Sequence, residues 1–296
     1  MSRCALKLQE VSKRFQNSNF ELSNISFEVP CGRIVGLVGE NGAGKTTLLR
    51  CVLQDLRPDS GKIEVFGKTY TQNEIEIKNS IGVVYNECGF DDGLTPMQIA
   101  HIMRNIYAAW KQEKFAQYLS KFHILPYKKV AELSEGMKKK LALAAAMSHA
   151  PKLLLLDEIT SGLDPIAREE VLDIFLEFIQ DEEHAILFSS HITADLDKIA
   201  DYIVLIGNGR IILKEIKDYL LYQYGIMRCT RGQFKRVNEN DILASRTKEH
   251  QIEILVKDRA RCKMQYPEIV IDAPGIEEVL MLMARKDFSH ERNFAG

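Results

Sequence analysis

The chain has 296 residues, of which 46% are hydrophobic, and this suits one large soluble domain or two smaller ones rather than a disordered chain. Its formal net charge is −2 and it contains no long basic block, so we expect no direct binding of nucleic acid. Its longest apolar runs are far shorter than the ~20 residues of a membrane-spanning helix, and its first eight residues do not resemble a signal peptide.

The first elements we expect are strands. Residues 5–11 and 25–29 alternate apolar with polar residues, which predicts half-exposed antiparallel strands. Residues 34–38 are wholly apolar and follow a turn, so they predict a buried strand. Phe15 lies in the loop between the first two strands, where its ring either forms the edge of the core or stacks on a nucleotide base.

A complete phosphate-binding loop follows the buried strand. The pattern G-x-x-x-x-G-K-[ST] is met by Gly39, Gly44, Lys45 and Thr46, ahead of a helix expected over residues 46–54. Backbone N–H groups and the helix dipole favour phosphate there, with Lys45 reaching the β- and γ-phosphates and Thr46 placing its hydroxyl on Mg²⁺. A chance match in a chain of this length has a probability of roughly 1%, so a fortuitous glycine-rich turn is disfavoured. The other nucleotide-binding residues that we assign to this loop are Asn41, Gly42 and Thr47.

Short strands are expected at residues 62–66 and 81–85, and the pattern then becomes helical. Thr95 and Pro96 are typical of an N-cap followed by proline at the first helical position. Three stretches carry apolar residues at helical spacing, namely 97–110, 115–122 and 136–149. We therefore expect a helical insert at about residues 87–150 within an α/β domain.

Residues 152–158 are an apolar run that ends in two carboxylates. Pro151 before the run and a Ser-Gly turn after it favour a central buried strand over a helix. The downstream pattern predicts helices over about 164–180 and 193–199 and strands over 185–189 and 202–206. Such alternation predicts a mostly parallel sheet with helices on both faces.

The two carboxylates at the end of this strand suit phosphoryl chemistry. Asp157 can hold Mg²⁺, and Glu158 can orient or deprotonate an attacking water. An isolated Asp-Glu pair would equally suggest surface ion pairs. Here three more motifs lie nearby: Leu-Ser-Glu-Gly-Met at 133–137, Ser-Gly-Leu-Asp at 161–164, and His191 after the next strand.

Taken together, these motifs make about residues 4–225 resemble the nucleotide-binding subunit of an ATP-binding cassette (ABC) transporter. The resemblance implies an α/β fold of the P-loop NTPase class, the ABC ATPase fold, with a mostly parallel sheet, an antiparallel β subdomain and the helical insert. On this basis we assign residues 1–225 to the ATPase domain. The cofactors implied are ATP and Mg²⁺, and the activity implied is ATP hydrolysis.

The resemblance also implies roles for residues outside the phosphate loop, and some of these roles require a second chain. Phe15 takes the adenine-stacking position, where the family more often has Tyr, and His191 contacts the γ-phosphate. Ser134 and Gly136 bind ATP held by a second copy of the chain or by a paralogous ATPase, and Asp164 belongs to the same nucleotide-binding set. Two ATP molecules are then enclosed in a head-to-tail dimer.

The sequence departs from the commoner family pattern in two places. Glu135 and Met137 stand where Gly and Gln are usual, which resembles the exporter branch with separate ATPase and permease chains. Asn86 stands where Gln is usual. By the resemblance we assign Asn86 the catalytic and metal-contacting role of that Gln, although its side chain is roughly 1.5 Å shorter. Glu87 is the alternative in the same loop. We interpret the lysines at 138–140 as a solvated helix face.

The implied partner is an integral membrane permease that docks near the loop between Asn86 and Asp92, where Phe90 is either an exposed contact or local packing. The protein is then cytoplasmic and peripheral on the inner face of the membrane, and its scattered cysteines fit reduced thiols. The substrate exported is a peptide, an antibiotic or a lipid. The alternatives are a soluble ABC-type ATPase that acts as a mechanical switch on ribosomes or nucleic acid, and a nucleotide-binding module without hydrolysis, which Glu158 argues against.

Residues 226–296 differ in character from the rest. Short β-rich stretches at 251–256 and 268–271 precede an apolar helix at 276–284, which predicts a small C-terminal α+β appendage. Its basic residues suit either solubility or contact with anionic lipid. Dimer contact, regulation and partner docking all remain open as its role.

Overall fold

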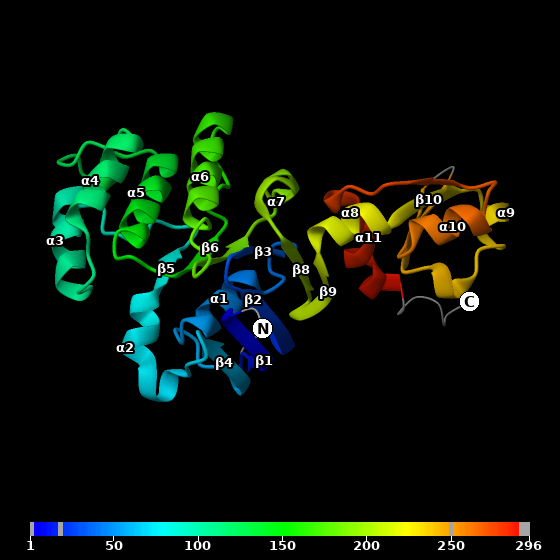
Figure 1. Cartoon of the computed structure of the whole chain (residues 1–296), viewed down its shortest axis with the longest axis horizontal. Coiled ribbons are helices and arrows are strands. Elements are labelled where there is room, and N and C mark those ends of the chain that lie inside the picture. The colour runs from blue at the N-terminus through cyan, green and yellow to red at the C-terminus, as the bar shows by residue number, and fades with distance from the viewer. Residues whose placement is uncertain (1–2, 17–19, 249–250, 290–296) are drawn as a thin grey trace.

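A six-stranded sheet lies at the centre of the computed structural model, which describes residues 3–16, 20–248 and 251–289 (Figure 1). Five of its strands are parallel and the last, β9, is antiparallel to β8. The strand order is β5 (Ile81–Val84), β6 (Leu153–Asp157), β7 (Ala185–Ser189), β3 (Arg33–Val38), β8 (Tyr202–Gly207) and β9 (Arg210–Ile216). The predicted parallel sheet is confirmed.

Both faces of this sheet are buried, which explains the unbroken apolar run in β6. Leu154 and Leu156 belong to the core on one face, and Leu153 and Leu155 to the core on the other. A parallel strand covered on both sides has no solvent face to alternate with, so its sequence is apolar throughout. Helices α5 (Glu135–Met147), α6 (Pro165–Phe178) and α7 (Thr193–Ile199) contribute buried residues to the first core.

A three-stranded antiparallel sheet covers the other face, in the order β2 (Glu21–Pro30), β1 (Cys4–Arg14) and β4 (Ser60–Val65). Helix α1 (Lys45–Val52) packs between the two sheets, since its buried residues share the core with both. Helix α2 (Tyr70–Ser80) links β4 to β5 and was not predicted. It buries only Ile77 and is kinked at Asn73, so it carries almost no helical periodicity.

The helical insert is confirmed and contains α3 (Pro96–Ile106), α4 (Gln112–Lys121), a short 3₁₀ turn (Val130–Glu132) and α5. Thr95 and Gln98 form a reciprocal capping box at the start of α3, with Pro96 at the first helical position as predicted. Phe90 is half-buried and packs against the core of the insert. The ring therefore contributes to local packing, and its exposed part leaves contact with a partner as a prediction.

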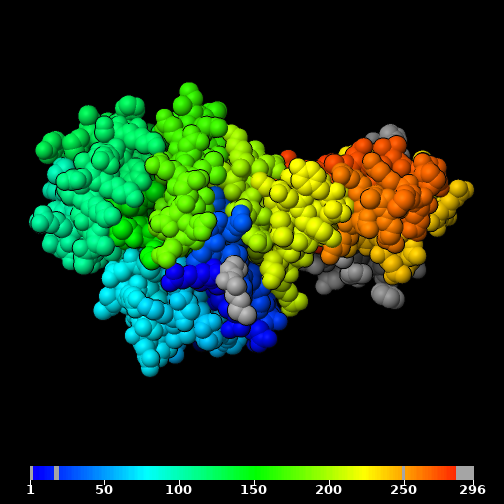
Figure 2. Space-filling view, viewed as in Figure 1, coloured from blue at the N-terminus to red at the C-terminus, as the bar shows by residue number. Residues whose placement is uncertain are grey.

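The C-terminal part contains a second antiparallel sheet, in the order β11 (Ala244–Thr247), β12 (Ile252–Val256), β10 (Gly225–Cys229) and β13 (Val270–Asp272). It projects from one end of the molecule, beyond α8 (Lys217–Gln223), as Figure 2 shows in orange. One face packs on α10 (Arg259–Gln265), with α9 (Arg231–Phe234) and the 3₁₀ turn Glu239–Asp241 nearby; the other packs on α11 (Ile276–Ser289). Within the described residues, no helix combines the length and hydropathy needed to cross a bilayer.

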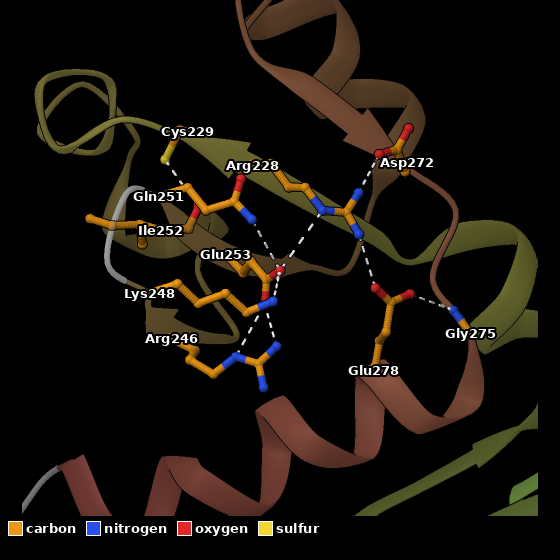
Figure 3. Close-up of polar contacts among 10 residues, drawn as sticks. All are labelled: Arg228, Cys229, Arg246, Lys248, Gln251, Ile252, Glu253, Asp272, Gly275 and Glu278. Carbon is orange, nitrogen blue, oxygen red and sulfur yellow. Dashed lines mark hydrogen bonds and ion pairs between the residues drawn. The ribbon is translucent and has the colours of Figure 1, made fainter.

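An ion-pair cluster fastens α11 to this sheet (Figure 3). The guanidinium of Arg228 on β10 contacts Glu253 on β12, Asp272 on β13 and Glu278 on α11. The side chain of Glu253 is only 5% exposed and also accepts hydrogen bonds from Arg246 and Lys248. One buried carboxylate thus pairs with cations from β10, from β11 and from Lys248 just after β11.

The stability of the C-terminal part is expected to depend on pH through Glu253. Burial raises its pKa, but the hydrogen bonds and charges of Lys248 and Arg246 outweigh burial and hold the pKa below the ordinary value. A carboxyl group with a lowered folded-state pKa stabilises the fold above its unfolded pKa, ~4.3, and this contribution is lost as the pH falls through the folded-state pKa. Glu253→Gln should therefore lower the free energy of unfolding by about 3 kcal/mol at pH 7.

Thermal unfolding of wild type and Glu253→Gln between pH 7 and pH 3 measures this effect. The gap between the two proteins should close as the pH falls below ~4. Glu277→Gln is a matched control, because Glu277 is an exposed acid in the first turn of α11 outside the cluster. A gap that stays constant across this range would contradict the assignment.

Candidate functional site

The phosphate-loop sequence forms a tight turn between β3 and α1, and two glycines allow it. A Cβ on Gly39 would lie 2.3 Å from the carbonyl oxygen of Ile206, so no side chain fits there. Gly44 has φ of +112° and lies against the side chains of Phe20 and Leu22. Gly44 is also the N-cap of α1 and has no side chain to cap it, so the first N–H groups of the helix are available to an anion.

The ammonium group of Lys45 is held at the mouth of this loop. The residue is only 5% exposed, and its Nζ donates to the carbonyl oxygens of Gly39 (2.8 Å) and Glu40 (3.2 Å). Its Nζ also lies 3.3 Å from Oε1 of Glu158. A buried cation at the positive end of a helix is well placed for a polyanionic ligand.

Asp157 ends β6 beside Thr46, so the two residues meet although 111 positions separate them. The hydroxyl of Thr46 donates to Oδ2 of Asp157 (2.6 Å), and the hydroxyl of Ser189 donates to Oδ1 (2.9 Å). These are hard oxygen ligands of the kind that Mg²⁺ takes, and Mg²⁺ usually completes its shell with phosphate oxygens and water. The donor set therefore fits Mg²⁺ held jointly with a nucleotide. The described residues contain no cluster of three or more His, Cys, Asp or Glu side chains that would hold a metal alone.

Glu158 lies at the centre of the site and has an unusual backbone. Its φ is +50°, in the left-handed region that non-glycine residues seldom occupy, and its N–H donates to the carbonyl of Ser189 (3.0 Å). Its carboxylate lies between two cationic or protonatable groups, 3.3 Å from Lys45 Nζ and 3.3 Å from Nδ1 of His191. The structure thus brings Lys45, Glu158 and His191 together.

Asn86 follows β5 and is exposed, and its side-chain oxygen accepts a hydrogen bond from Nζ of Lys139 (2.8 Å). Glu87 beside it is exposed as well. The prediction that residues 138–140 form a solvated helix face is wrong for Lys139, which is only 7% exposed. This burial lowers the pKa of Lys139.

A signal for the burial of Lys139 was present in the sequence. On a helix it shares a face with Leu143 and Ala146, four and seven residues further on, and both are buried. The run of three lysines hid this periodicity. Lys138 and Lys140 are half-buried and form ion pairs with Glu135 and Glu170 respectively.

Three predicted nucleotide-binding residues lie at helix starts away from the loop. Ser134 is the N-cap of α5, with its hydroxyl accepting from the N–H of Met137 (3.3 Å), and Gly136 packs beside Leu163. Oδ1 of Asp164 accepts from two N–H groups of α6, and these hydrogen bonds lower its pKa. Among the described residues, no hydrogen bond or ion pair joins any of the three to the phosphate loop of the same chain.

Phe15 lies just beyond the end of β1 and is half-buried. Its ring centroid is 6.4 Å from that of Phe20, which in turn lies against Gly44. An aromatic pair thus extends from the phosphate loop toward the surface.

A cavity of about 390 Å³ opens between the phosphate loop and α11. Its lining includes Asn41 and His191 from the site and Leu280 and Met281 from α11. The C-terminal helix therefore faces the phosphate loop directly, an arrangement that the sequence did not predict.

A parallel sheet, a glycine-rich loop at a helix N-terminus after β3, and a carboxylate pair at the end of β6, with β7 between the two strands, define a P-loop nucleoside triphosphatase. Residues 22–161 match the ABC transporter family. The chain is 34% identical over 218 residues to the ABC transporter ATP-binding protein NatA of Bacillus subtilis, covering 71% of this chain and 88% of that protein. The chain therefore belongs to the ATP-binding proteins of ABC transporters.

Other relatives agree with this assignment. The bacitracin transport ATP-binding protein BcrA of Bacillus licheniformis is 32% identical over 217 residues, covering 73% of this chain and 71% of that protein. A solved ATP-binding subunit of an ABC transporter superposes with a TM-score of 0.67 at 25% identity, covering 78% of this chain and 93% of that one. The predicted ABC ATPase fold, binding of ATP and ATP hydrolysis are confirmed by this membership.

Proposed function

We propose that the chain hydrolyses Mg²⁺-bound ATP as one of two ATPase subunits that drive export through a separate membrane permease. The observation that carries the proposal is the meeting of Lys45, Glu158 and His191 beside the Thr46–Asp157 pair. A cation, a carboxylate and an imidazole around one anion site are the groups that phosphoryl transfer to water requires.

Each side chain then has one task. The loop from Gly39 to Thr47 binds the phosphates through its N–H groups, and Lys45 turns from Glu158 to the β- and γ-phosphates. Glu158, freed from Lys45, orients the attacking water and accepts its proton, while His191 contacts the γ-phosphate.

Two oxygen atoms hold the metal in this proposal, those of Thr46 and Asp157. The bound Mg²⁺ supplies positive charge that offsets the charge developing on the phosphates. Asn86 is the candidate contact to a metal-bound water, with Glu87 as the alternative in the same loop. Because the oxygen of Asn86 is held by Lys139 in the structure, only a movement of this loop would bring it to the metal.

We further propose that the ATP sites are completed by a second copy of the chain. In the part of the chain that the structure describes, no hydrogen bond or ion pair joins Ser134, Gly136 or Asp164 to the phosphate loop, and a head-to-tail dimer would put them at the loop of the other copy. A dimeric ATP-binding cassette bound to ADP and Pi has a similar fold, with a TM-score of 0.63 at 21% identity. Phe15 is the proposed adenine-stacking residue.

The direction and the partner of transport are inferred from relatives. The chain resembles bacitracin and lantibiotic transport ATP-binding proteins, and it also resembles a phosphonate import ATP-binding protein at 29% identity. The names of the first two favour transport of a peptide antibiotic, and the exporter-like signature at Glu135 and Met137 favours export. The permease is proposed to dock on the loop between Asn86 and Asp92, which keeps the protein on the inner face of the membrane.

The domain division is also a proposal. Residues 1–225 form the ATPase domain, with its helical subdomain at about 87–150, and residues 226–296 form the accessory segment. A separate hydrophobic cluster on the α10 face of the C-terminal sheet supports this division. Against a fully independent unit, α11 packs into the same core as α8 and the central sheet.

A pull-down tests the partner. The tagged full chain, purified from detergent-solubilised membranes of its source, should retain a polytopic membrane protein in stoichiometric yield. Glu87→Lys in the proposed docking loop should reduce this yield, whereas Glu113→Lys, an equally exposed position on α4, should not. Recovery of ribosomes or nucleic acid without a membrane protein would support the soluble-switch alternative instead.

A further inference from the structure

The buried side chain of Lys139 joins helix α5 to two loops of the proposed catalytic site. Its Nζ donates to the side-chain oxygen of Asn86 (2.8 Å), the carbonyl of Glu158 (3.2 Å) and the carbonyl of Ser161 (2.6 Å). An ammonium group has three hydrogens and here it has three acceptors. Asn86 lies on the loop after β5, and Glu158 and Ser161 lie on the loop after β6, while the donor lies on α5.

The arrangement is specific to Lys139 among the three consecutive lysines. Lys138 pairs with Glu135 and Asp92 at the surface, and Lys140 pairs with Glu170 on α6. Neither contacts the backbone around Glu158 among the contacts that the structure describes. Because burying a charge is costly unless it is hydrogen-bonded, the three acceptors of Lys139 are what hold its side chain in this position.

The contact with Glu158 matters because that residue needs support. A non-glycine residue at φ of +50° is strained and persists only where its surroundings determine its conformation. Its N–H donates to the carbonyl of Ser189 on one side, and its own carbonyl accepts from Lys139 and from the N–H of Ser161 on the other. These contacts fix the backbone from which the carboxylate projects toward Lys45 and His191.

We propose that Lys139 is a positioning residue for ATP hydrolysis, which holds the Glu158 backbone in its active conformation and links it to Asn86 and Ser161. The proposal rests on the role of Glu158 in the proposed function. A shift of the Asn86 loop changes the hydrogen bonding of Lys139 and so the support of Glu158. The same ammonium group holds the carbonyl of Ser161, at the start of the segment that ends in Asp164, so a shift of Lys139 would also reach this segment.

Substitution of Lys139 tests this in the purified full chain. Lys139→Met removes the ammonium group and keeps a long apolar stem, and Lys139→Gln keeps a shorter neutral donor. We expect kcat to fall about 10- to 100-fold in Lys139→Met and less in Lys139→Gln, because small misplacements of a catalytic group have effects of this size. The Kd for ATP should stay within about twofold, since the hydrogen bonds described for Lys139 go to Asn86, Glu158 and Ser161 and not to the phosphate loop.

Lys140→Met is the matched control, with the same substitution one position along the same helix. It should leave kcat and Kd within about twofold of wild type, with thermal unfolding confirming that all variants fold. Equal kcat in Lys139→Met and Lys140→Met would overturn the proposal. So would a loss of ATP binding that accompanies the loss of kcat.

A double-mutant cycle tests the link to Asn86. If Lys139 acts through its hydrogen bonds to Asn86 and Glu158, the fold-reductions in kcat caused by Asn86→Ala and Lys139→Met should not multiply. The kcat of the double variant should then be about that of the slower single variant. A double variant slowed by the product of the two single effects would mean that the residues act independently, against the proposed link.

Hydrogen exchange tests the support of Glu158 without any turnover. The N–H of Ser161 donates to the carbonyl of Glu158 (3.1 Å), so its protection reports on this backbone. Exchange at residues 158–163 should become faster in Lys139→Met and not in Lys140→Met. A wild-type chain that bound ATP without hydrolysing it would refute the proposed function, and this exchange comparison would still decide whether Lys139 holds the Glu158 backbone.

Discussion

Lys45→Ala is expected to bind ATP at least about 100-fold more weakly than wild type. The ammonium group is the one buried cation at the mouth of the phosphate loop in the described structure, and charge-assisted hydrogen bonds to phosphate contribute on the order of 1.5–3 kcal/mol each. Two such bonds, to the β- and γ-phosphates, correspond to a factor of at least about 100 in the dissociation constant.

Equilibrium binding of a fluorescent ATP analogue measures this loss, with ATP hydrolysis followed in parallel. Lys62→Ala is the control, since Lys62 forms an exposed ion pair with Glu64 on β4, away from the loop. Unchanged affinity in Lys45→Ala would mean that the phosphates bind elsewhere and that the loop geometry has another purpose.

Glu158→Gln is expected to retain ATP binding and to lose hydrolysis by a factor of about 10² to 10⁴, the usual contribution of a positioned general base. The amide keeps the shape of the side chain and cannot accept the proton of the attacking water. The carboxylate also lies 3.3 Å from Nζ of Lys45, so it competes with the phosphates for this ammonium group. The variant lacks that competition, and its affinity for ATP should equal or exceed that of wild type.

Single-turnover hydrolysis and equilibrium binding together decide this prediction. Glu169→Gln is the control, because Glu169 is an exposed acid that pairs with Lys198 outside the site. Normal hydrolysis by Glu158→Gln would show that Glu158 is not the general base. His191 or Asn86 would then be the candidates for orienting the attacking water.

Sequence reasoning was most successful where one physical constraint fixes both pattern and structure. The phosphate loop is such a case, because Gly39 and Gly44 occupy positions that no side chain fits. The apolar run of β6 is another, since burial on both faces leaves no room for polar residues. In both places the elements were predicted correctly to within a few residues.

The sequence failed where local pattern and three-dimensional environment disagree. Helix α2 buries a single residue, so its periodicity was too weak to predict. Lys139 was assigned to the surface because three lysines in succession are typical of a charged face, whereas its acceptors come from residues up to 53 positions away. The approach of α11 to the phosphate loop depends likewise on long-range packing.

The central proposal is that a second copy of the chain completes each ATP site. The most direct test is the mass in solution of Glu158→Gln with Mg²⁺ and ATP, measured by light scattering during gel filtration. We expect twice the 33.7 kDa of one chain with ATP and a single-chain mass with ADP, and Ser134→Arg should prevent the increase. A chain that binds ATP and stays at 33.7 kDa would contradict this proposal.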